Sequence, residues 1–266
     1  GMNGMLLVSD LFSLYVFMEV TGICCFVLIA MFHTRADLEG SFKYLVMSEL
    51  ASIFILSGLA FLFMKNGSLG YEDLAGFSAE LEAGSLPDLL AHVGLIFLLS
   101  GFALKAGVAP FHSWLPDAHQ SADTSVSVLL SGVVIKVAGV YGLIVLTKLF
   151  GAFAPVRATL AVLGLFTIAV GALLAGRQGH FKRVVAYSSV SQMGYILLAL
   201  STGTTLGLAA ALAHVFSHAA FKSTLFANAA ALHEQAGTLE LSELGGLDAR
   251  MPATAFTSVV AFLSTA

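Results

Sequence analysis

The chain has 266 residues, of which 58% are hydrophobic and 11% are charged, and its formal net charge is −4 at pH 7. A soluble domain carries about 25% charged residues, so this composition, with a mean hydropathy of +0.92, excludes an ordinary soluble fold. The negative net charge and the scattered basic residues also exclude the electrostatic surface that binds nucleic acid. The sequence therefore indicates an integral membrane protein that contacts the lipid bilayer.

Apolar runs of about 20 residues, long enough to cross a bilayer, recur along the sequence. Seven are expected to span the membrane: 7–32, 42–64, 90–110, 124–147, 157–176, 183–202 and 206–232. An eighth run begins near Thr254 and reaches Ala266, which is too short to span. We expect an all-α polytopic membrane helix bundle that forms one domain over residues 1–266, with seven full spans and a truncated eighth.

Basic residues mark one face of this bundle. The connections between the first and second spans and between the fifth and sixth carry Arg35, Lys43, Arg177, Lys182 and Arg183. If the spans alternate, both connections lie on the same face, which the positive-inside rule makes cytoplasmic. The connection 65–89 lies on the opposite face and is acidic, with Glu72, Asp73, Glu80, Glu82 and Asp88. Lys148 and Arg157, expected on that opposite face, disagree with this orientation.

Three lysines and one glutamate stand out within the expected spans: Lys105, Lys136, Lys222 and Glu19. One such side chain near the bilayer centre costs about 3 kcal/mol on the insertion scale, so this set indicates that the chain moves charge across the membrane. The alternative is a membrane scaffold in which these charges serve only helix packing. Glu49, about two turns into the second span, is either a charge-pair partner or an interfacial residue.

The third expected span contains a helix break. In the segment Lys105-Ala-Gly-Val-Ala-Pro110, Gly107 tolerates unusual dihedral angles and Pro110 cannot donate to the carbonyl of Ala106. Irregular backbone at membrane depth is tolerated only where protein or water satisfies it, so a broken helix beside a buried Lys105 is typical of an ion site. In the alternative interpretation the helix ends at Gly107, and Lys105 snorkels to the surface.

The polar segment that follows is expected near the cytoplasmic interface. His112 and His119 flank Trp114, which suits an aromatic belt, and interfacial anchoring is the favoured interpretation of these side chains. Asp123 stands directly before the next apolar run, which is the usual place of a helix-capping residue.

The seventh span carries an ordered polar set. His214, His218 and Lys222 fall at i, i+4 and i+8, nearly on one helix face. Three interpretations stay open: a water-filled proton relay, because imidazole titrates near neutrality, interhelical hydrogen bonds, and a metal site, which lacks a third ligand on this helix. Cys24 and Cys25 are adjacent and cannot share a metal as a spaced pair can, and no phosphate loop or dinucleotide fingerprint is present. We expect no metal and no cofactor in this chain.

Several of these segments resemble one protein family. They are Lys105–His119, Leu130–Lys136, Val140–Gly142, Phe181–Gly194 and His218–Lys222, the last followed by Leu225 and Phe226. Together they resemble the antiporter-like, proton-translocating subunits of respiratory complex I, of membrane-bound hydrogenases and of multisubunit cation/proton antiporters. The resemblance implies an inverted-repeat fold with a discontinuous helix, of which this chain, cut at both ends, holds a fragment.

The resemblance also implies a proton relay. Glu19 matches the family's glutamate, Lys105 its lysine partner on the broken helix, Lys136 the connecting lysine and His218 a relay member. A nearby charge can open the pair between Glu19 and Lys105, so that one site biases the protonation of the next. Lys222 occupies a position that is often lysine in some branches, and His214 is added to the expected relay because its spacing puts it on the same helix face.

One position departs from the family. Asp123 and Ser125 stand where many relatives have proline. The additional carboxylate either alters a proton access path or merely caps the helix that follows.

The implied function is that of a proton-translocating membrane subunit of a redox-driven complex, of the NADH-quinone oxidoreductase or membrane-bound hydrogenase type. The residues of the segment Leu130–Lys136 slightly favour the hydrogenase branch. The alternative is a subunit of a multisubunit sodium/proton antiporter without redox activity. We expect other membrane subunits as partners, protons or sodium ions as the transported species, and the prokaryotic plasma membrane as the location. In the redox-driven case the chain is a non-redox subunit of an oxidoreductase.

Overall fold

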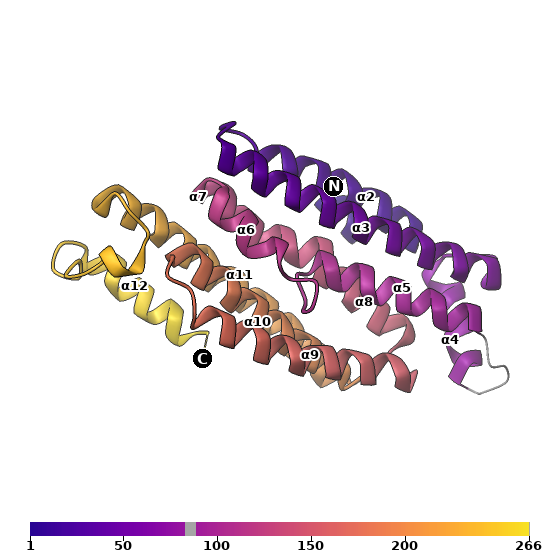
Figure 1. Cartoon of the computed structure of the whole chain (residues 1–266). Helices are drawn as coiled ribbons and strands as arrows, with labels where there is room; N and C mark the ends of the chain where they lie inside the picture. The colour runs from indigo at the N-terminus through magenta and orange to yellow at the C-terminus, as the bar shows by residue number, and fades with distance from the viewer. Residues whose placement is uncertain (83–88, 266) are drawn as a thin grey trace.

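The computed structural model describes residues 1–82 and 89–265, with only the backbone of Glu82. These residues form helices and connecting segments without a named strand. The elements are α1 (Met2–Leu7), α2 (Leu11–Ile29), α3 (Arg35–Asn66), α4 (Tyr71–Glu82), α5 (Leu89–Lys105), α6 (Trp114–Ser121), α7 (Thr124–Leu129), η1 (Leu130–Val134), η2 (Lys136–Val140), α8 (Tyr141–Phe150), α9 (Ala154–Ala175), α10 (Phe181–Ser201), α11 (Thr205–Ala236), η3 (Leu241–Glu243) and α12 (Pro252–Leu263). The long helices lie side by side in an elongated bundle (Figure 1).

Local sequence sets the ends of the longest helices. Thr34 and Asp37 form a capping box at the start of α3, and the Thr204 hydroxyl accepts from the first turn of α11. Both helices end at a glycine in the left-handed region, Gly67 at φ 72° and Gly237 at φ 72°. A residue with a Cβ is strained there, so glycine ends each helix without penalty.

The predicted all-α membrane bundle is confirmed. Of the described residues, five stretches are long and apolar enough to span a membrane: Leu11–Ile29, Arg35–Asn66, Thr124–Phe150, Ala154–Ala175 and Phe181–Ser201. The helix α11 has 32 residues but is not among these five, and its central turns carry histidine and lysine. Each of the seven expected spans overlaps a helix of the structure, with 90–110 overlapping the shorter apolar helix α5 and 206–232 overlapping α11. The number of helices that cross the bilayer stays a prediction.

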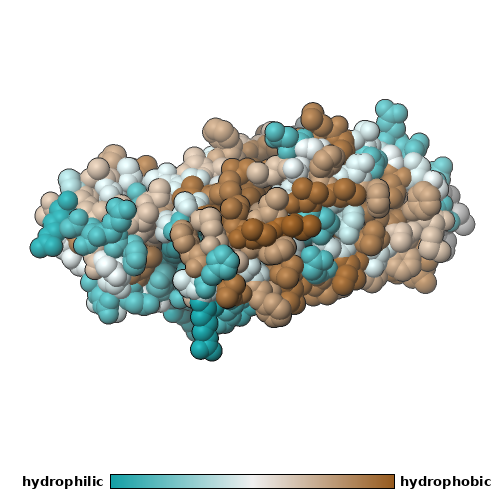
Figure 2. All heavy atoms as spheres, turned by 90° about the horizontal axis from the view of Figure 1, so that it is seen from above, coloured by the Kyte–Doolittle hydropathy of each residue, from teal (hydrophilic) through white to brown (hydrophobic). Residues whose placement is uncertain are grey.

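The outer surface of the bundle suits lipid. On α9 the side chains of Val162, Leu165 and Leu173 are exposed, while Gly164 faces the backbone of Gly194 on α10, where a Cβ would lie 2.9 Å from a carbonyl oxygen. Small residues at a helix contact let two backbones approach closely. One face of the molecule shows a broad hydrophobic band in its middle, with hydrophilic residues gathered mainly toward the two ends (Figure 2).

The acidic connection 65–89 contains a helix that the sequence interpretation did not predict. Helix α4 buries Leu74, Phe77, Ser78 and Leu81 at helical spacing and turns its acidic side chains outward. This i, i+3, i+4, i+7 pattern indicates an amphipathic helix. The sequence interpretation missed it because it considered only the acidic residues of this connection. Asp88 and the side chain of Glu82 lie outside the described residues.

The two basic connections meet at one end of the bundle, the left end in Figure 1, as predicted. Asp117 on α6 accepts from Lys43 on α3 at 2.9 Å and from Arg183 on α10 at 2.9 Å. We call this the basic end; the side of the membrane that it faces stays a prediction.

The predicted eighth run forms α12, which packs on α11. Asn228 of α11 donates to Thr257 Oγ1 at 3.0 Å and to Ser258 Oγ at 2.9 Å. These side-chain hydrogen bonds hold α12 in register against α11, where both helices are mostly apolar.

Candidate functional site

The third expected span is broken where the sequence predicts. Helix α5 ends at Lys105, Gly107 has φ 69°, and the N–H of Val108 donates to Ala103 O at 2.9 Å instead of continuing the α-helical ladder. The irregular segment runs through Pro110 to Ser113, and α6 then begins at Trp114. It is longer than the predicted break between Lys105 and Pro110.

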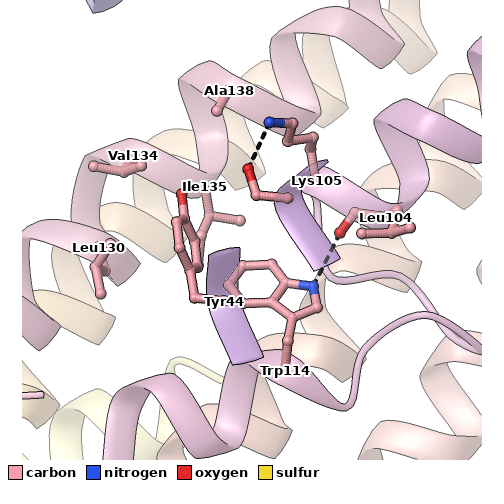
Figure 3. Close-up of a pocket in the computed structure, with 9 residues that line it drawn as sticks. Tyr44, Leu104, Lys105, Trp114, Leu130, Val134, Ile135 and Ala138 are labelled. Atoms are coloured by element: carbon pink, nitrogen blue, oxygen red, sulfur yellow. Dashed lines mark hydrogen bonds between the residues drawn. The ribbon is translucent and has the colours of Figure 1, made fainter. Parts of the chain in front are cut away.

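Protein groups satisfy the backbone of this break. The N–H of Ala109 donates to Thr167 Oγ1 on α9 at 3.2 Å, and Trp114 Nε1 donates to Leu104 O at 3.1 Å (Figure 3). Helices α5 and α6 both pack along α3, so they form the two halves of one discontinuous helix. The alternative in which Lys105 snorkels is wrong, because its side chain is only 5% exposed.

Glu19 and Lys105 form the predicted ion pair. Lys105 Nζ lies 3.1 Å from Glu19 Oε1 and donates to Ser48 Oγ at 2.7 Å. The Ser52 hydroxyl donates to the same carboxylate oxygen at 2.5 Å. Helices α2, α3 and α5 thus supply one hydrogen-bonded cluster, in which neither buried charge is left alone.

Lys136 lies in a widened part of its helix. The turns Leu130–Val134 and Lys136–Val140 are π-helical, a distortion found frequently at functional sites. The residue is 5% exposed, and its Nζ has no hydrogen-bond partner among the described residues. Lys136 therefore faces the protein interior, as the relay interpretation requires.

The break in α5 packs directly on the Lys136 segment. A Cβ on Gly139 would lie 2.7 Å from the carbonyl carbon of Lys105, so only glycine permits this backbone contact. A small cavity lies beside it, lined by Ser48, Lys105, Ile135 and other side chains (Figure 3). The space open to the centres of water molecules is about 20 Å³, enough for about one water.

The polar set on α11 also faces inward. Lys222 is fully buried, and its Nζ donates to Val185 O at 2.9 Å and to the Ser188 hydroxyl. His218 is 1% exposed, and its ring centroid lies 6.4 Å from that of the half-buried His214.

Lys136 lies close enough to His214, His218 and Lys222 for its positive charge to disfavour a positive charge on each of them. Neither ring nitrogen of His218 has a partner in the described part of the chain, so interhelical hydrogen bonds do not explain this residue. Within residues 1–82 and 89–265 no group of three or more His, Cys, Asp or Glu is placed to hold a metal. The water-filled relay stays a prediction.

The expectation that Trp114 and His119 anchor the chain at the interface is wrong. Trp114 is 5% exposed and His119 is 0% exposed, and His119 stacks on Phe226 of α11 at 4.5 Å between ring centroids. Trp114, Leu115, Ala118 and His119 are spaced as one buried face of α6. That spacing was the signal in the sequence that identifies His119 as an interior residue.

The comparisons with known proteins agree with this geometry. Residues 8–266 match the family described as NADH:quinone oxidoreductase/Mrp antiporter, TM. The chain belongs to this family. It is 35% identical to NADH-quinone oxidoreductase subunit N of Desulforudis audaxviator, over 99% of this chain and 52% of that protein. It is 34% identical to an Na(+)/H(+) antiporter subunit of Alkalihalophilus pseudofirmus, over 100% of this chain and 53% of that protein.

A solved structure has the same antiporter-like fold. The match is to a chain of the membrane-bound sulfane sulfur reductase, described as an archaeal respiratory membrane complex, with a TM-score of 0.87 and 32% sequence identity. It covers 97% of this chain and 52% of that one. The chain thus spans about half the length of the curated relatives it matches. The roles of the individual relay residues are not fixed by these likenesses.

The structure describes two positions whose roles the sequence leaves open. Asp123 caps α7, accepting from Ser125 N at 2.8 Å, and hydrogen bonds from Ser125 hold the pKa of this carboxyl below its usual value. Glu49 is exposed and forms no ion pair with the described residues, although its charge acts on Lys105. The sequence interpretation missed Ser48 and Ser52, whose i, i+4 spacing places both on one face of the helix.

Proposed function

We propose that the chain conducts protons as a membrane subunit of a redox-driven multisubunit complex in the prokaryotic plasma membrane. One observation carries the proposal: unpartnered polar atoms from three parts of the chain gather in the interior near Lys136. Among the described residues these are His119 Nδ1 and Nε2, Ser131 Oγ, Lys136 Nζ, His214 Nε2, and His218 Nδ1 and Nε2.

Burial of so many unpaired polar groups favours internal water. Each unsatisfied buried group costs about 1–3 kcal/mol, and water molecules with two to four polar partners remove that cost. Lysine and histidine side chains that share such water can accept and release protons in turn. The interior around Lys136 then becomes a conducting path that lipid and apolar side chains surround.

The ion pair between Glu19 and Lys105 is suited to control this path. The contact of Gly139 with the α5 break places the Lys105 end of the pair against the Lys136 segment. Opening the pair removes a negative charge from beside Lys105 and changes the field at the next lysine. A charge change in a neighbouring subunit can thereby be passed on as a change in protonation.

The names of the relatives support a multisubunit complex. Quinone oxidoreductase subunits and the sulfane sulfur reductase chain are matched over nearly all of this chain. In our proposal the redox centres and their cofactors belong to other subunits, and this chain carries neither metal nor cofactor. The likeness to a reductase complex agrees with the resemblance of Leu130–Lys136 to the hydrogenase branch of the family.

A second candidate function is membership of a sodium/proton antiporter. The match to the Na(+)/H(+) antiporter protein of Alkalihalophilus pseudofirmus, at 34% identity, favours it. The two candidates differ in their driving force: an electron donor in the first, and a sodium gradient in the second. The same buried path would serve both.

The test uses the intact complex in sealed vesicles containing a pH-sensitive dye. Addition of the electron donor should start proton uptake, and Lys136→Ala should lower its rate with little loss of assembly. Lys148→Ala, at an exposed lysine on α8, is the matched control. Proton movement that needs a sodium gradient and ignores the donor would favour the antiporter, while equal rates in all variants would contradict conduction through Lys136.

A further inference from the structure

The surface at the basic end of the bundle contains two hollows, beyond the end of the polar interior. One hollow of about 370 Å³ is lined by residues that include Asp37, Asp123, His180 and Lys182. A second, of about 430 Å³, also contacts His180. Both are wide enough for many water molecules. Water at this end therefore reaches the start of α10 and the turn between α6 and α7.

Lys182 forms part of the floor of the first hollow. Its side chain is 5% exposed, and its Nζ donates to Ala122 O at 2.8 Å. The charges of Asp123 and Asp37 act on it from the hollow. This lysine ties the first turn of α10 to the turn after α6, one helical turn beyond His119.

His119 lies between the hollow and the interior. The charge of Lys182 acts on it from the hollow, and the charges of Lys136 and Lys222 act on it from within the bundle. Its ring is 0% exposed, and both of its nitrogens lack a partner in the described part of the chain.

The ring is held in place without using its nitrogens. Stacking on Phe226 occupies the ring face, and the Ser127 hydroxyl donates to the backbone oxygen of His119 at 3.2 Å. Neither ring nitrogen is thus used by the described residues, and the neutral ring has one donor and one acceptor with which to hydrogen-bond water.

We propose that His119 passes protons between water in the hollow at the basic end and the polar interior around Lys136. This inference rests on the proposed function. A hydronium ion on one side gives its proton to the bare ring nitrogen and becomes water. The other nitrogen then gives its proton to water on the far side, which becomes hydronium, and the ring is neutral again. Only N–H and O–H bonds form and break, and no oxidant or reductant is consumed.

The variants His119→Gln and His119→Phe test this step in the intact complex. Glutamine keeps a polar side chain that can hydrogen-bond to water, and phenylalanine keeps the stacking on Phe226, but neither takes up a proton. General acid–base steps contribute about 10²–10⁴-fold, so we expect both variants to lower the rate of donor-driven proton uptake by at least about tenfold. The control is His233→Gln, at an exposed histidine that lines the same hollow.

The outcomes separate this inference from the proposed function. Unchanged uptake in both His119 variants, together with loss of uptake in Lys136→Ala, would overturn the role of His119 alone. Unchanged uptake in Lys136→Ala would overturn conduction as a whole.

A second measurement does not depend on the variants folding. A cryo-EM map of the unmodified complex that resolves ordered water should place water against both nitrogens of His119. A dry contact at both nitrogens would overturn the inference even if the variants fail to assemble.

Discussion

Gly139 lies against the peptide that joins Lys105 to Ala106, at the point where α5 breaks. A Cβ at this position would approach the Lys105 carbonyl carbon to 2.7 Å. Because both neighbours are backbone, the added methyl group cannot be accommodated by a side-chain rotation. The contact couples the broken helix to the π-helical segment that carries Lys136.

We therefore expect Gly139→Ala to be destabilising. Overpacking of a close contact costs about 1–3 kcal/mol, and the variant should lower the thermal unfolding temperature of the complex. The matched control is Gly76→Ala on α4, where a Cβ meets nothing within 4 Å and alanine improves helix propensity. Equal stability of the two variants would contradict the close contact.

Exchange of the charges at positions 19 and 105 tests the ion pair. Glu19→Gln leaves Lys105 without its carboxylate and should slow proton uptake and lower stability. The double variant Glu19→Lys with Lys105→Glu restores opposite charges and should recover stability relative to either single exchange. The unfolding temperatures of Glu19→Lys, Lys105→Glu and the double variant measure this, and additive losses would show that the two side chains do not interact.

Thr167→Val tests how the broken backbone is satisfied. The substitution keeps the shape but leaves the N–H of Ala109 without its acceptor, which costs about 1–3 kcal/mol. On the same helix, Thr159 is exposed, and within the described residues its hydroxyl donates to Pro155 O of its own helix. Thr159→Val should change stability much less in the same thermal assay, and a similar loss in both would refute the assigned role of Thr167.

The junction at Asp117 should depend on salt. Its two ion pairs at the basic end are partly exposed, with side-chain exposures of 45% for Lys43 and 27% for Arg183. Exposed pairs contribute about 0.2–1 kcal/mol each and are screened by salt. Asp117→Ala should lower stability at low ionic strength and lose that effect at high ionic strength. A loss that is independent of salt would assign Asp117 a packing role instead.

Asp123 should give a pH-dependent contribution to stability. Hydrogen bonds from Ser125 lower the pKa of this carboxyl in the folded state, so the ionised cap stabilises the fold above the unfolded pKa of about 3.9. That contribution is lost as the pH falls through the lower folded pKa. Asp123→Asn should thus be less stable than the wild type at neutral pH and match it in strong acid, as followed by thermal unfolding against pH.

The sequence predicts much of this architecture because membrane helices leave direct signals. The length of the apolar runs predicted the positions of the helices, and Gly107 and Pro110 predicted the position of the break. The sequence predicted that Lys105 has a partner because an isolated charge at that depth is costly. The family resemblance identified Glu19 as that partner.

Other features depend on tertiary contacts that spacing alone does not encode. The stacking of His119 on Phe226 is one of them, because the two residues lie far apart in the chain. Apolar runs identify a helix but not its winding, so the π-helical turns around Lys136 could not be predicted. Helix α4 was predictable from its apolar spacing, but its acidic residues drew the interpretation toward a loop.

The most direct test of the central claim is a double-variant cycle between Lys105 and Lys136. Proton uptake per assembled complex is measured for Lys105→Ala, Lys136→Ala and the double variant. If both lysines serve one continuous path, the double variant should be no slower than the slower single variant, because residues acting as a unit are not additive. Losses that multiply in the double variant would show two independent paths and contradict this account.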